Sequence, residues 1–219
     1  MILIKIGGSL IGNARNLVST LHKYALTTDK RILIVPGGGI FADTVRTASK
    51  AYGISDEAAH WMAILAMDQY AHYLTDGTPA KLVTGIADTS SAGAGTSVLL
   101  VYDLLKKSES RSTSRSTSES GIAHTWNATS DTIAGWIASQ LNATFIKATD
   151  VNGILREGTQ LTEITASELL TMGKTCVDPE LPGLLLSKSM NCRVMNGNNP
   201  DHVIDAIRGI PRGTLIIGQ

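Results

Sequence analysis

Two glycine clusters, each placed directly after a short apolar run, constrain the fold of this chain more than any other feature. Residues 2–6 are followed by Gly7, Gly8 and Ser9, and residues 31–35 are followed, after one proline, by Gly37, Gly38 and Gly39. An uninterrupted apolar run indicates a strand that is buried on both faces. Glycines allow backbone N–H groups to approach an anion at the start of the next helix. The two loops therefore predict a site for more than one phosphate, with Lys5 as its natural counter-charge.

Composition and charge exclude several classes of protein. The formal net charge of the 219 residues is zero, so nucleic-acid binding has little electrostatic support. No apolar stretch approaches the roughly 18 residues of a membrane span. Because the chain enters a strand at once, with no basic leader or cleavage site, we expect a cytoplasmic protein that is not secreted. Cys176 and Cys192 match no common metal pattern, and we expect both to be structural thiols.

Apolar runs alternate with helical patterns along the whole chain. This alternation predicts a single α/β domain over residues 1–219, built as a three-layer α/β/α arrangement around an open, mainly parallel sheet. The expected strands are 2–6, 31–35, 81–84, 97–101, 144–148, 192–195 and 214–217.

The helix expected over residues 56–74 has few charges and carries apolar side chains around most of its circumference. A helix of this kind is buried on several sides. Two interpretations remain open: a central core helix, or a helix that packs on its copy in a homodimer, which we favour. We interpret His60 and His72 on this helix as packing or hydrogen-bonding residues and not as ligands.

Residues 108–120 are rich in Ser, Thr and Arg and nearly free of apolar side chains. Such a segment cannot bury enough surface to offset the entropy of ordering it. We expect a flexible surface loop, and a plain linker is favoured over a lid above the active site.

Two later patterns have the composition of a polar site. Asp131 falls in the first turn of an expected helix, where a carboxylate stays ionised. It is placed either to hold the ammonium of Lys5 or merely to complement the helix dipole. The strand at 144–148 ends in a polar turn with Asp150 and Gly153, and ligands of open α/β sheets bind outside the carboxyl ends of strands. Alone, this second pattern is also an ordinary strand and turn.

Taken in order, the four motifs resemble the amino acid kinase family. They read Lys-x-Gly-Gly-Ser, Pro-Gly-Gly-Gly, Ser-Asp-x-x-Ala and Lys-x-Thr-Asp-Val-x-Gly, and the resemblance runs from residue 2 to about 217. It implies the open, mainly parallel sheet of that family and phosphoryl transfer from ATP with Mg²⁺. From the apolar helix at 56–74 we expect a homodimer or higher homo-oligomer. The resemblance also implies that residues of about 1–125 bind the acceptor and form the dimer, whereas residues of about 126–219 bind the nucleotide.

The resemblance implies a role for each motif. Lys5 would contact the transferred phosphoryl group, and Asp131 would orient Lys5. The donor nucleotide would be bound by Gly7, Gly8, Ser9, Lys147, Thr149, Asp150, Asn152 and Gly153. The phosphorylated acceptor would lie against Gly37, Gly38, Gly39, Arg46, Asn127 and Thr129. No metal-ligating side chain can be named.

The chain departs from family members that carry Gly-Gly-Met-x-x-Lys before the penultimate strand, because residues 175–182 resemble instead the Met-Asp turn of uridylate kinases. A second catalytic lysine is therefore not placed. We expect Arg46 to supply the missing charge as a third catalytic residue, against the alternative of a solvated helix residue. Lys188 is expected to be a surface residue.

Charge and a finer resemblance favour a phosphomonoester as the acceptor over a hydroxyl or a carboxylate, although a carboxylate acceptor would also need no base. A phosphomonoester has a second pKa near about 6, so it needs no general base before it attacks. The region 37–46 offers glycine amides, a guanidinium that suits phosphate geometry, and a single carboxylate, Asp43. Residues 39–46 and 59–67 resemble the archaeal branch of the family that converts (5-(aminomethyl)furan-3-yl)methyl phosphate to its diphosphate in methanofuran biosynthesis. Uridylate kinase, isopentenyl phosphate kinase and a non-catalytic nucleotide- or oxyanion-binding protein remain alternatives.

Overall fold

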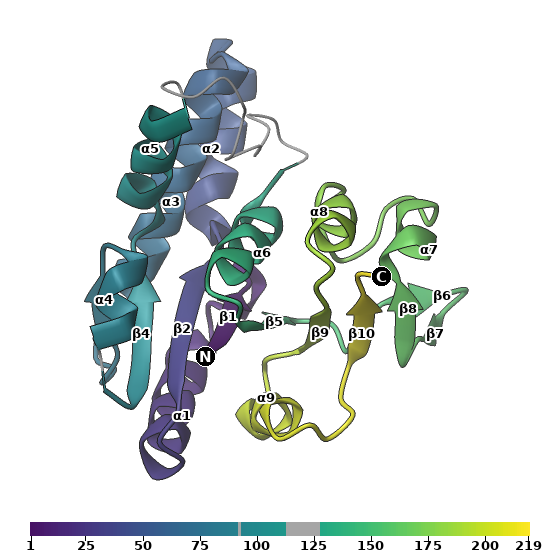
Figure 1. Cartoon of the computed structure of the whole chain (residues 1–219). Coiled ribbons are helices and arrows are strands. Elements are labelled where there is room, and N and C mark those ends of the chain that lie inside the picture. Colours follow the sequence, from purple (N-terminus) through teal and green to yellow (C-terminus); the bar gives the residue numbers. More distant parts are fainter. Residues whose placement is uncertain (92, 113–127) are drawn as a thin grey trace.

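The computed structural model describes residues 1–91, 93–112 and 128–219, and an open sheet crosses the middle of the molecule (Figure 1). Within these ranges the sheet has the strand order β3-β4-β2-β1-β5-β9-β10-β8. Among the described strands of this sheet, β9–β10 is the one antiparallel pair, so the expected mainly parallel sheet is confirmed. The strands are β1 (Ile2–Ile6), β2 (Arg31–Pro36), β3 (Lys81–Val83), β4 (Gly95–Leu99), β5 (Thr144–Thr149), β8 (Glu163–Thr165), β9 (Cys192–Asn196) and β10 (Thr214–Ile217). A small separate hairpin pairs β6 (Leu155–Arg156) with β7 (Thr159–Gln160).

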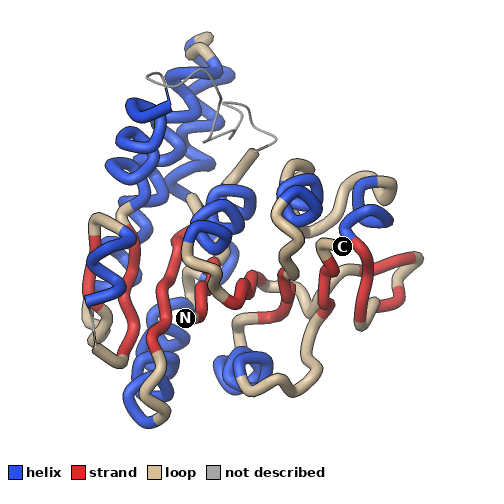
Figure 2. The backbone as a smooth tube through the Cα atoms, viewed as in Figure 1, coloured by secondary structure: helices blue, strands red, loops and turns tan. Residues whose placement is uncertain are grey.

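Helices cover both faces of the sheet, as the tube view shows (Figure 2), and the three-layer expectation is confirmed. One apolar cluster packs α6 and α8 against one face, and a second packs α1 and α9 against the other. The antiparallel helices α2 and α3 pack along each other and extend beyond the sheet (Figure 1). The helices are η1 (Gly8–Leu10), α1 (Ala14–Thr27), α2 (Gly39–Tyr52), α3 (Asp56–Thr75), α4 (Ile86–Ser91), α5 (Val101–Ser112), α6 (Ser130–Gln140), α7 (Ala166–Leu170), α8 (Leu181–Ser187) and α9 (Pro200–Ile207).

Strand β1 is buried along its whole length and sends alternate side chains to opposite faces. Ile2, Ile4 and Ile6 join the cluster with α1, whereas Leu3 joins the cluster with α6. Lys5 follows the direction of Leu3 and therefore enters the layer that holds α6. The alternation of the strand thus decides which helix can supply a counter-charge.

Two sequence-based boundaries were wrong. The strand expected at 97–101 runs instead over Gly95–Leu99, because the Asp68 carboxylate on α3 accepts a hydrogen bond from the backbone N–H of Val101 at 2.6 Å and starts α5 there. Residues 108–112 of the expected flexible loop are helical instead, since α5 continues to Ser112. Residues 113–120 of that expected loop lie outside the described part of the chain.

Helix α3 serves both apolar clusters. Trp61, Ile64 and Met67 pack in the cluster with α6, whereas Tyr70 and Leu74 pack in the cluster with α1. The core-helix interpretation therefore accounts for most of its apolar surface. Two of its apolar side chains remain partly exposed, Met62 at 37% and Leu65 at 44%.

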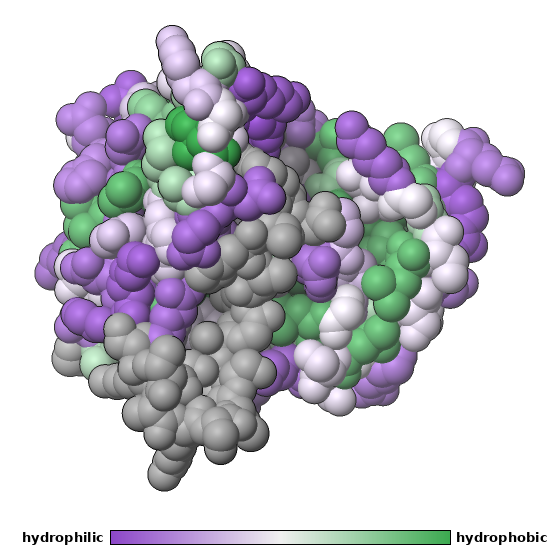
Figure 3. All heavy atoms as spheres, turned by 90° about the horizontal axis from the view of Figure 1, so that it is seen from above, coloured by the Kyte–Doolittle hydropathy of each residue, from purple (hydrophilic) through white to green (hydrophobic). Residues whose placement is uncertain are grey.

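On the face seen in Figure 3, hydrophilic side chains alternate with apolar patches. Among the helices that the structure describes, none has the length and apolar character needed to cross a membrane. Cys176 and Cys192 are both free thiols.

Candidate active site

The two glycine loops lie against each other at the carboxyl ends of β1 and β2. A Cβ atom on Gly8 would stand 2.0 Å from the Cα of Gly39, and one on Gly38 would stand 2.3 Å from the Cβ of Ala42. Gly39 itself has a φ of +52°, a region that L side chains rarely adopt. The loops therefore need glycine for their mutual packing as well as for access to their backbone amides.

Backbone hydrogen bonds hold these loops in place. The N–H of Gly7 donates to the carbonyl of Ala148 on β5 at 2.9 Å, and the N–H of Gly37 donates to the carbonyl of Ile6 at 2.8 Å. The buried Tyr70 hydroxyl on α3 donates to the carbonyl of Gly7 at 3.3 Å. Both loops are thus fixed to the sheet and to α3.

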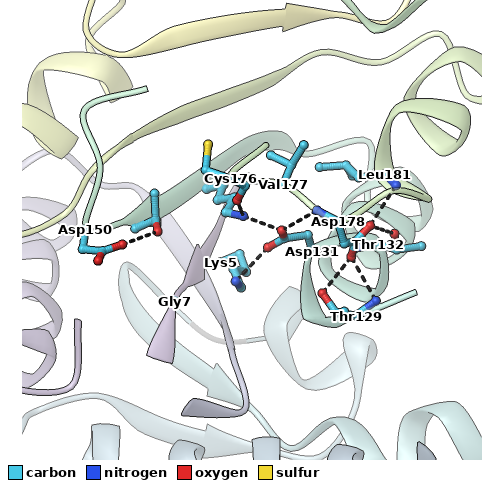
Figure 4. A network of polar contacts seen from close by, with 12 residues as sticks. Lys5, Gly7, Thr129, Asp131, Thr132, Asp150, Cys176, Val177, Asp178 and Leu181 are labelled. Atoms are coloured by element: carbon cyan, nitrogen blue, oxygen red, sulfur yellow. Dashed lines mark hydrogen bonds and ion pairs between the residues drawn. The ribbon is translucent and has the colours of Figure 1, made fainter. Parts of the chain in front are cut away.

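A buried carboxylate, Asp131, forms ion pairs with two lysines, and Figure 4 shows its contact with Lys5. Its Oδ1 lies 2.7 Å from the Nζ of Lys5, and its Oδ2 accepts from the Nζ of Lys147. Lys5 and Lys147 are register partners on the adjacent strands β1 and β5, so their like charges stand side by side. Lys147 also donates to the carbonyl of Cys176. Asp131 is therefore the counter-charge of a lysine pair and not a simple complement to the helix dipole.

The charges of this group perturb one another. Burial alone would raise the pKa of Asp131, but Lys5 and Lys147 outweigh that effect and lower the pKa to about 2. Burial lowers the pKa of Lys5 below its ordinary value, and the neighbouring Asp131 opposes this shift only in part. The carboxylate is thus ionised throughout the neutral range, and the Lys5 amine gives up its proton more readily than a lysine in water.

A cavity of about 240 Å³ opens beside the glycine loops. Its walls come from η1, the start of α2, one side of α3 and the start of α6. The predicted site residues that line it are Gly8, Ser9, Gly38, Gly39, Arg46 and Thr129. The wall is otherwise mainly apolar, with the polar exceptions Asp43, Asp56, His60 and Ser130. Because α6 supplies part of the wall, the cavity draws on both halves of the chain.

Arg46 lines this cavity from α2, one turn after Asp43. Its guanidinium forms an ion pair with the Asp43 carboxylate at 2.6 Å. The side chain is about half exposed, with 46% of its surface accessible. Arg46 is thus present at the cavity with its orientation set partly by its neighbour on the same helix.

Gly8 and Ser9 apart, the residues expected to bind the nucleotide do not line this cavity, and Thr149, Asp150, Asn152 and Gly153 lie at or just after the carboxyl end of β5. The Thr149 hydroxyl donates to the Asp150 carboxylate at 3.1 Å, and a hydrogen bond from Ser9 lowers the pKa of Asp150. The side chains of Asn152 and Asn196 are hydrogen-bonded at 2.9 Å, which fixes the turn. Gly153 is buried, and a Cβ there would stand 2.5 Å from the Thr214 hydroxyl. Tight packing alone explains this last glycine.

Three further residues predicted to bind the acceptor have different outcomes. Thr129 lies at the start of α6, where its N–H and its hydroxyl both donate to Oδ2 of Asp178, at 2.9 Å and 2.8 Å. Asn127 lies outside the described residues. Gly37 contacts the other loop, since a Cβ there would stand 3.1 Å from the Gly8 nitrogen.

Sequence reasoning missed several residues of the site. His60 was interpreted as a packing residue, and its ring does meet Trp61 edge-on at 5.2 Å, but it also lines the cavity. Asp56, the first residue of α3, lines the cavity as well. Asp178 lies within residues 175–182, whose sequence indicates only a turn. No local pattern identifies these three residues, because the chain brings them to the site from separate elements.

Replacement of Asp131 by Asn should destabilise the protein strongly. The change leaves the buried charges of Lys5 and Lys147 without a counter-charge, and we expect the free energy of unfolding to fall by about 3–5 kcal/mol. Adding Lys147→Met to Asp131→Asn should recover part of this loss. Urea denaturation measures both. Since the pKa of Asp131 is lowered from 3.8, ionised Asp131 stabilises the folded protein above that pH, and this stabilisation is lost as the pH falls toward 2. The Asn variant should not show this loss of stability.

The matched control is Asp76→Asn, which removes the carboxylate of an exposed pair with Arg15 at 3.0 Å. Exposed pairs contribute about 0–1 kcal/mol, so this variant should unfold near the wild-type urea concentration. Equal urea midpoints for Asp131→Asn and Asp76→Asn would show that the buried ion group stabilises the fold no more than an exposed ion pair.

Comparison with known proteins agrees with this geometry. The sequence profile of the amino acid kinase family matches residues 1–196. A relative from Methanocaldococcus jannaschii, [5-(aminomethyl)furan-3-yl]methyl phosphate kinase, is 34% identical over 216 residues, which cover 95% of this chain and 94% of that protein.

Solved structures show the same fold at low sequence identity. A uridylate kinase from Archaeoglobus fulgidus superposes with a TM-score of 0.74 at 18% identity, covering 99% of this chain and 100% of that one. The UMP kinase from Bacillus anthracis superposes with a TM-score of 0.69 at 15% identity, covering 100% of this chain and 96% of that one. An aspartate kinase from Synechocystis superposes with a TM-score of 0.66 at 17% identity, and the match covers 100% of this chain but 40% of that one. The profile match and the full-length relative confirm the resemblance read from the four motifs: the chain belongs to the amino acid kinase family.

Proposed function

We propose that this protein transfers the γ-phosphoryl group of ATP to the phosphate of a phosphomonoester, giving a diphosphate and ADP. The acceptor that we propose is (5-(aminomethyl)furan-3-yl)methyl phosphate, the compound in the name of the relative at 34% identity. The observation that carries the proposal is the position of the Lys5 amine. The Asp131 carboxylate holds this amine at 2.7 Å, between β1 and α6. Gly8 and Ser9, shortly after β1, and Thr129, directly before α6, line the cavity.

The chemistry asks for positioning and positive charge more than for covalent help. An oxygen of the acceptor phosphate forms a bond to the γ-phosphorus while the bond from that phosphorus to the bridging oxygen breaks, and ADP leaves. Backbone amides of the glycine loops and the Lys5 ammonium would neutralise the oxygens of the group in transfer. The acceptor oxygen is already anionic at neutral pH, so no side chain has to remove a proton.

The donor would lie along the carboxyl ends of β1 and β5. Gly7, Gly8 and Ser9 would face its phosphates, and the turn with Thr149, Asp150 and Asn152 would face the nucleoside. Lys147, which we expected to bind the nucleotide directly, has its amine on Asp131 and Cys176, so we propose that it acts mainly by supporting that carboxylate. Mg²⁺ would be held chiefly by phosphate oxygens, the usual arrangement in sites of this kind.

The acceptor would occupy the cavity. Gly38, Gly39 and Arg46 would bind its phosphate, and the ion pair with Asp43 would keep the guanidinium turned toward the cavity. The apolar side chains of Ile64, Met67 and Ile133 suit a flat ring between the two ends of the acceptor. Asp56 supplies a carboxylate in the same cavity, which suits an acceptor that also carries a protonated amine.

We also propose that the protein forms a homodimer through α3, whose side chains Met62 and Leu65 are partly exposed. Residues of about 1–125 would then carry the dimer face and most of the acceptor cavity, and residues of about 126–219 would carry the nucleotide. The need for ATP fits the expected cytoplasmic location. Sedimentation equilibrium of the full chain measures the oligomeric state.

Replacement of Lys5 by Met should abolish most of the activity and leave the fold intact. The variant lacks the charge that faces the transferred group, so we expect kcat to fall by about 10²–10³-fold. Acceptor-dependent release of ADP measures kcat, and circular dichroism checks the fold. The control is Lys188→Met, at the end of α8, which should keep the wild-type rate.

The same assay tests the acceptor. We expect the furan phosphate to be preferred over UMP and isopentenyl phosphate in kcat/KM. Tight ATP binding with no acceptor-dependent ADP would instead indicate a non-catalytic nucleotide-binding protein. A wild-type rate for Lys5→Met would disprove the proposed role of the lysine.

Replacement of Asp56 by Asn should reduce the preference for an amine on the acceptor. Wild-type protein should favour the aminomethyl compound over an analogue with a methyl group in its place, and Asp56→Asn should narrow that ratio of kcat/KM by about tenfold, the weight of a hydrogen bond to a charged group. Glu57→Gln, at the neighbouring position outside the cavity lining, is the matched control. An unchanged ratio would show that Asp56 does not contact the amine.

A further inference from the structure

We propose that Asp178 is a positioning residue: it fixes Asp131, and through it the Lys5 amine, relative to the wall of the acceptor cavity. This inference rests on the proposed function, since it concerns the same site. Asp178 itself does not line the cavity, so it would act on the acceptor through its neighbours.

The Asp178 carboxylate is buried, with 7% of the residue exposed, and it accepts hydrogen bonds from three residues. Oδ2 accepts from the N–H and hydroxyl of Thr129 and from the N–H of Thr132 at 3.0 Å. Oδ1 accepts from the Thr132 hydroxyl at 2.5 Å and from the Leu181 N–H at 2.9 Å. Figure 4 shows these contacts converging on one side chain. A single carboxylate thus ties the first turn of α6 to the start of α8.

The backbone around Asp178 reaches the charged group directly. The N–H of Asp178 donates to Oδ2 of Asp131 at 3.2 Å, and two residues earlier the carbonyl of Cys176 accepts from Lys147. The turn 176–178 therefore contacts both the acid and one of its lysines. In Figure 4, Asp131 lies between Lys5 and the Asp178 cluster.

Thr129 and Asp131 lie on either side of Ser130 at the start of α6. The Asp178 carboxylate accepts hydrogen bonds from Thr129 and Thr132 and so fixes this turn. Thr129 lines the cavity, whereas Asp131 carries the Lys5 amine. A small rotation of the turn would move the acceptor wall and the amine together. A displacement of about 1 Å can lower a rate by about 100-fold, so a residue that fixes the position of this turn should affect kcat.

Thr132 offers the cleanest test, because it is buried, does not line the cavity and carries no charge. Thr132→Val keeps the shape and removes only the hydroxyl donor to Asp178. We expect kcat for ADP release to fall about tenfold, as for loss of one hydrogen bond to a charged group, with little change in the KM for ATP. Thr132→Ser restores the donor and should restore most of the rate.

The pKa of Lys5 gives a second readout that does not depend on activity. The charged groups that act on the Lys5 amine are Asp131, Lys147 and Asp178, and Asp131 raises its pKa. If Thr132→Val lets Asp131 move away, the pKa of Lys5 should fall below the wild-type value. NMR titration of protein labelled with ¹³C-lysine, assigned with Lys5→Met, measures it. Thr132→Val leaves all three charges in place, which Asp178→Asn does not.

Asp178→Asn is the second variant, and its kcat should fall about 100-fold in the folded protein. Thr78→Val is the control: it removes a partly buried hydroxyl that donates to the Leu74 carbonyl at 3.0 Å, three residues after the end of α3. It should leave both kcat and the pKa of Lys5 at their wild-type values.

The results separate a positioning role from a structural one. A lower melting temperature for Thr132→Val, with unchanged kcat and an unchanged Lys5 pKa, would overturn the proposal, as would a wild-type kcat in folded Asp178→Asn. If wild-type protein released no ADP with any acceptor, the proposed function would fail, and the Lys5 titration would still decide whether Asp178 positions the amine.

Discussion

The buried ion group of Lys5, Asp131 and Lys147 is the constraint on which the rest of this structure depends. Register places the two lysines side by side on β1 and β5, where their like charges repel. Neither lysine could remain charged in the interior without a partner, because burial of an unpaired charge is strongly unfavourable. Asp131 offers one oxygen to each amine. The group therefore fixes how α6 sits on the sheet, and with it the start of α6 that forms part of the cavity wall.

The site combines two sources of positive charge, the backbone amides of the glycine loops and the buried ion group. The two glycine loops come so close that a Cβ on Gly8 would collide with Gly39, and they present amides at the edge of the sheet. The ion group lies beneath them and directs a cation toward the same edge. Amides supply many weak, fixed donors, whereas a lysine that is held by a carboxylate supplies one concentrated charge. This combination suits the spread of negative charge over the oxygens of a phosphoryl group in transfer.

The parts of the fold and site that come from neighbouring residues could be predicted from the sequence, whereas contacts between residues far apart in the chain could not. The strands β1 and β2 and the glycine loops follow from local patterns. The residues alone left two interpretations of Asp131, a partner for Lys5 or a complement to the helix dipole, and the family resemblance favoured the first. The partnership of Lys147 with the same acid could not be predicted, because it needs the register of β5 against β1. Asp178 depends on a turn that returns to α6 from 46 residues away, and nothing local marks it. Strand β8 and the β6–β7 hairpin contain only two or three residues each, too few for a periodic signal.

A crystal structure with ADP, Mg²⁺, a planar phosphoryl mimic such as aluminium fluoride, and the acceptor phosphate would test the central claim most directly. The account places the Lys5 amine within about 2.7–3.1 Å of an oxygen or fluorine of the mimic, with Asp131 still on its other side. A mimic bound beyond the reach of Lys5, while the amine stays enclosed by Asp131 alone, would contradict it.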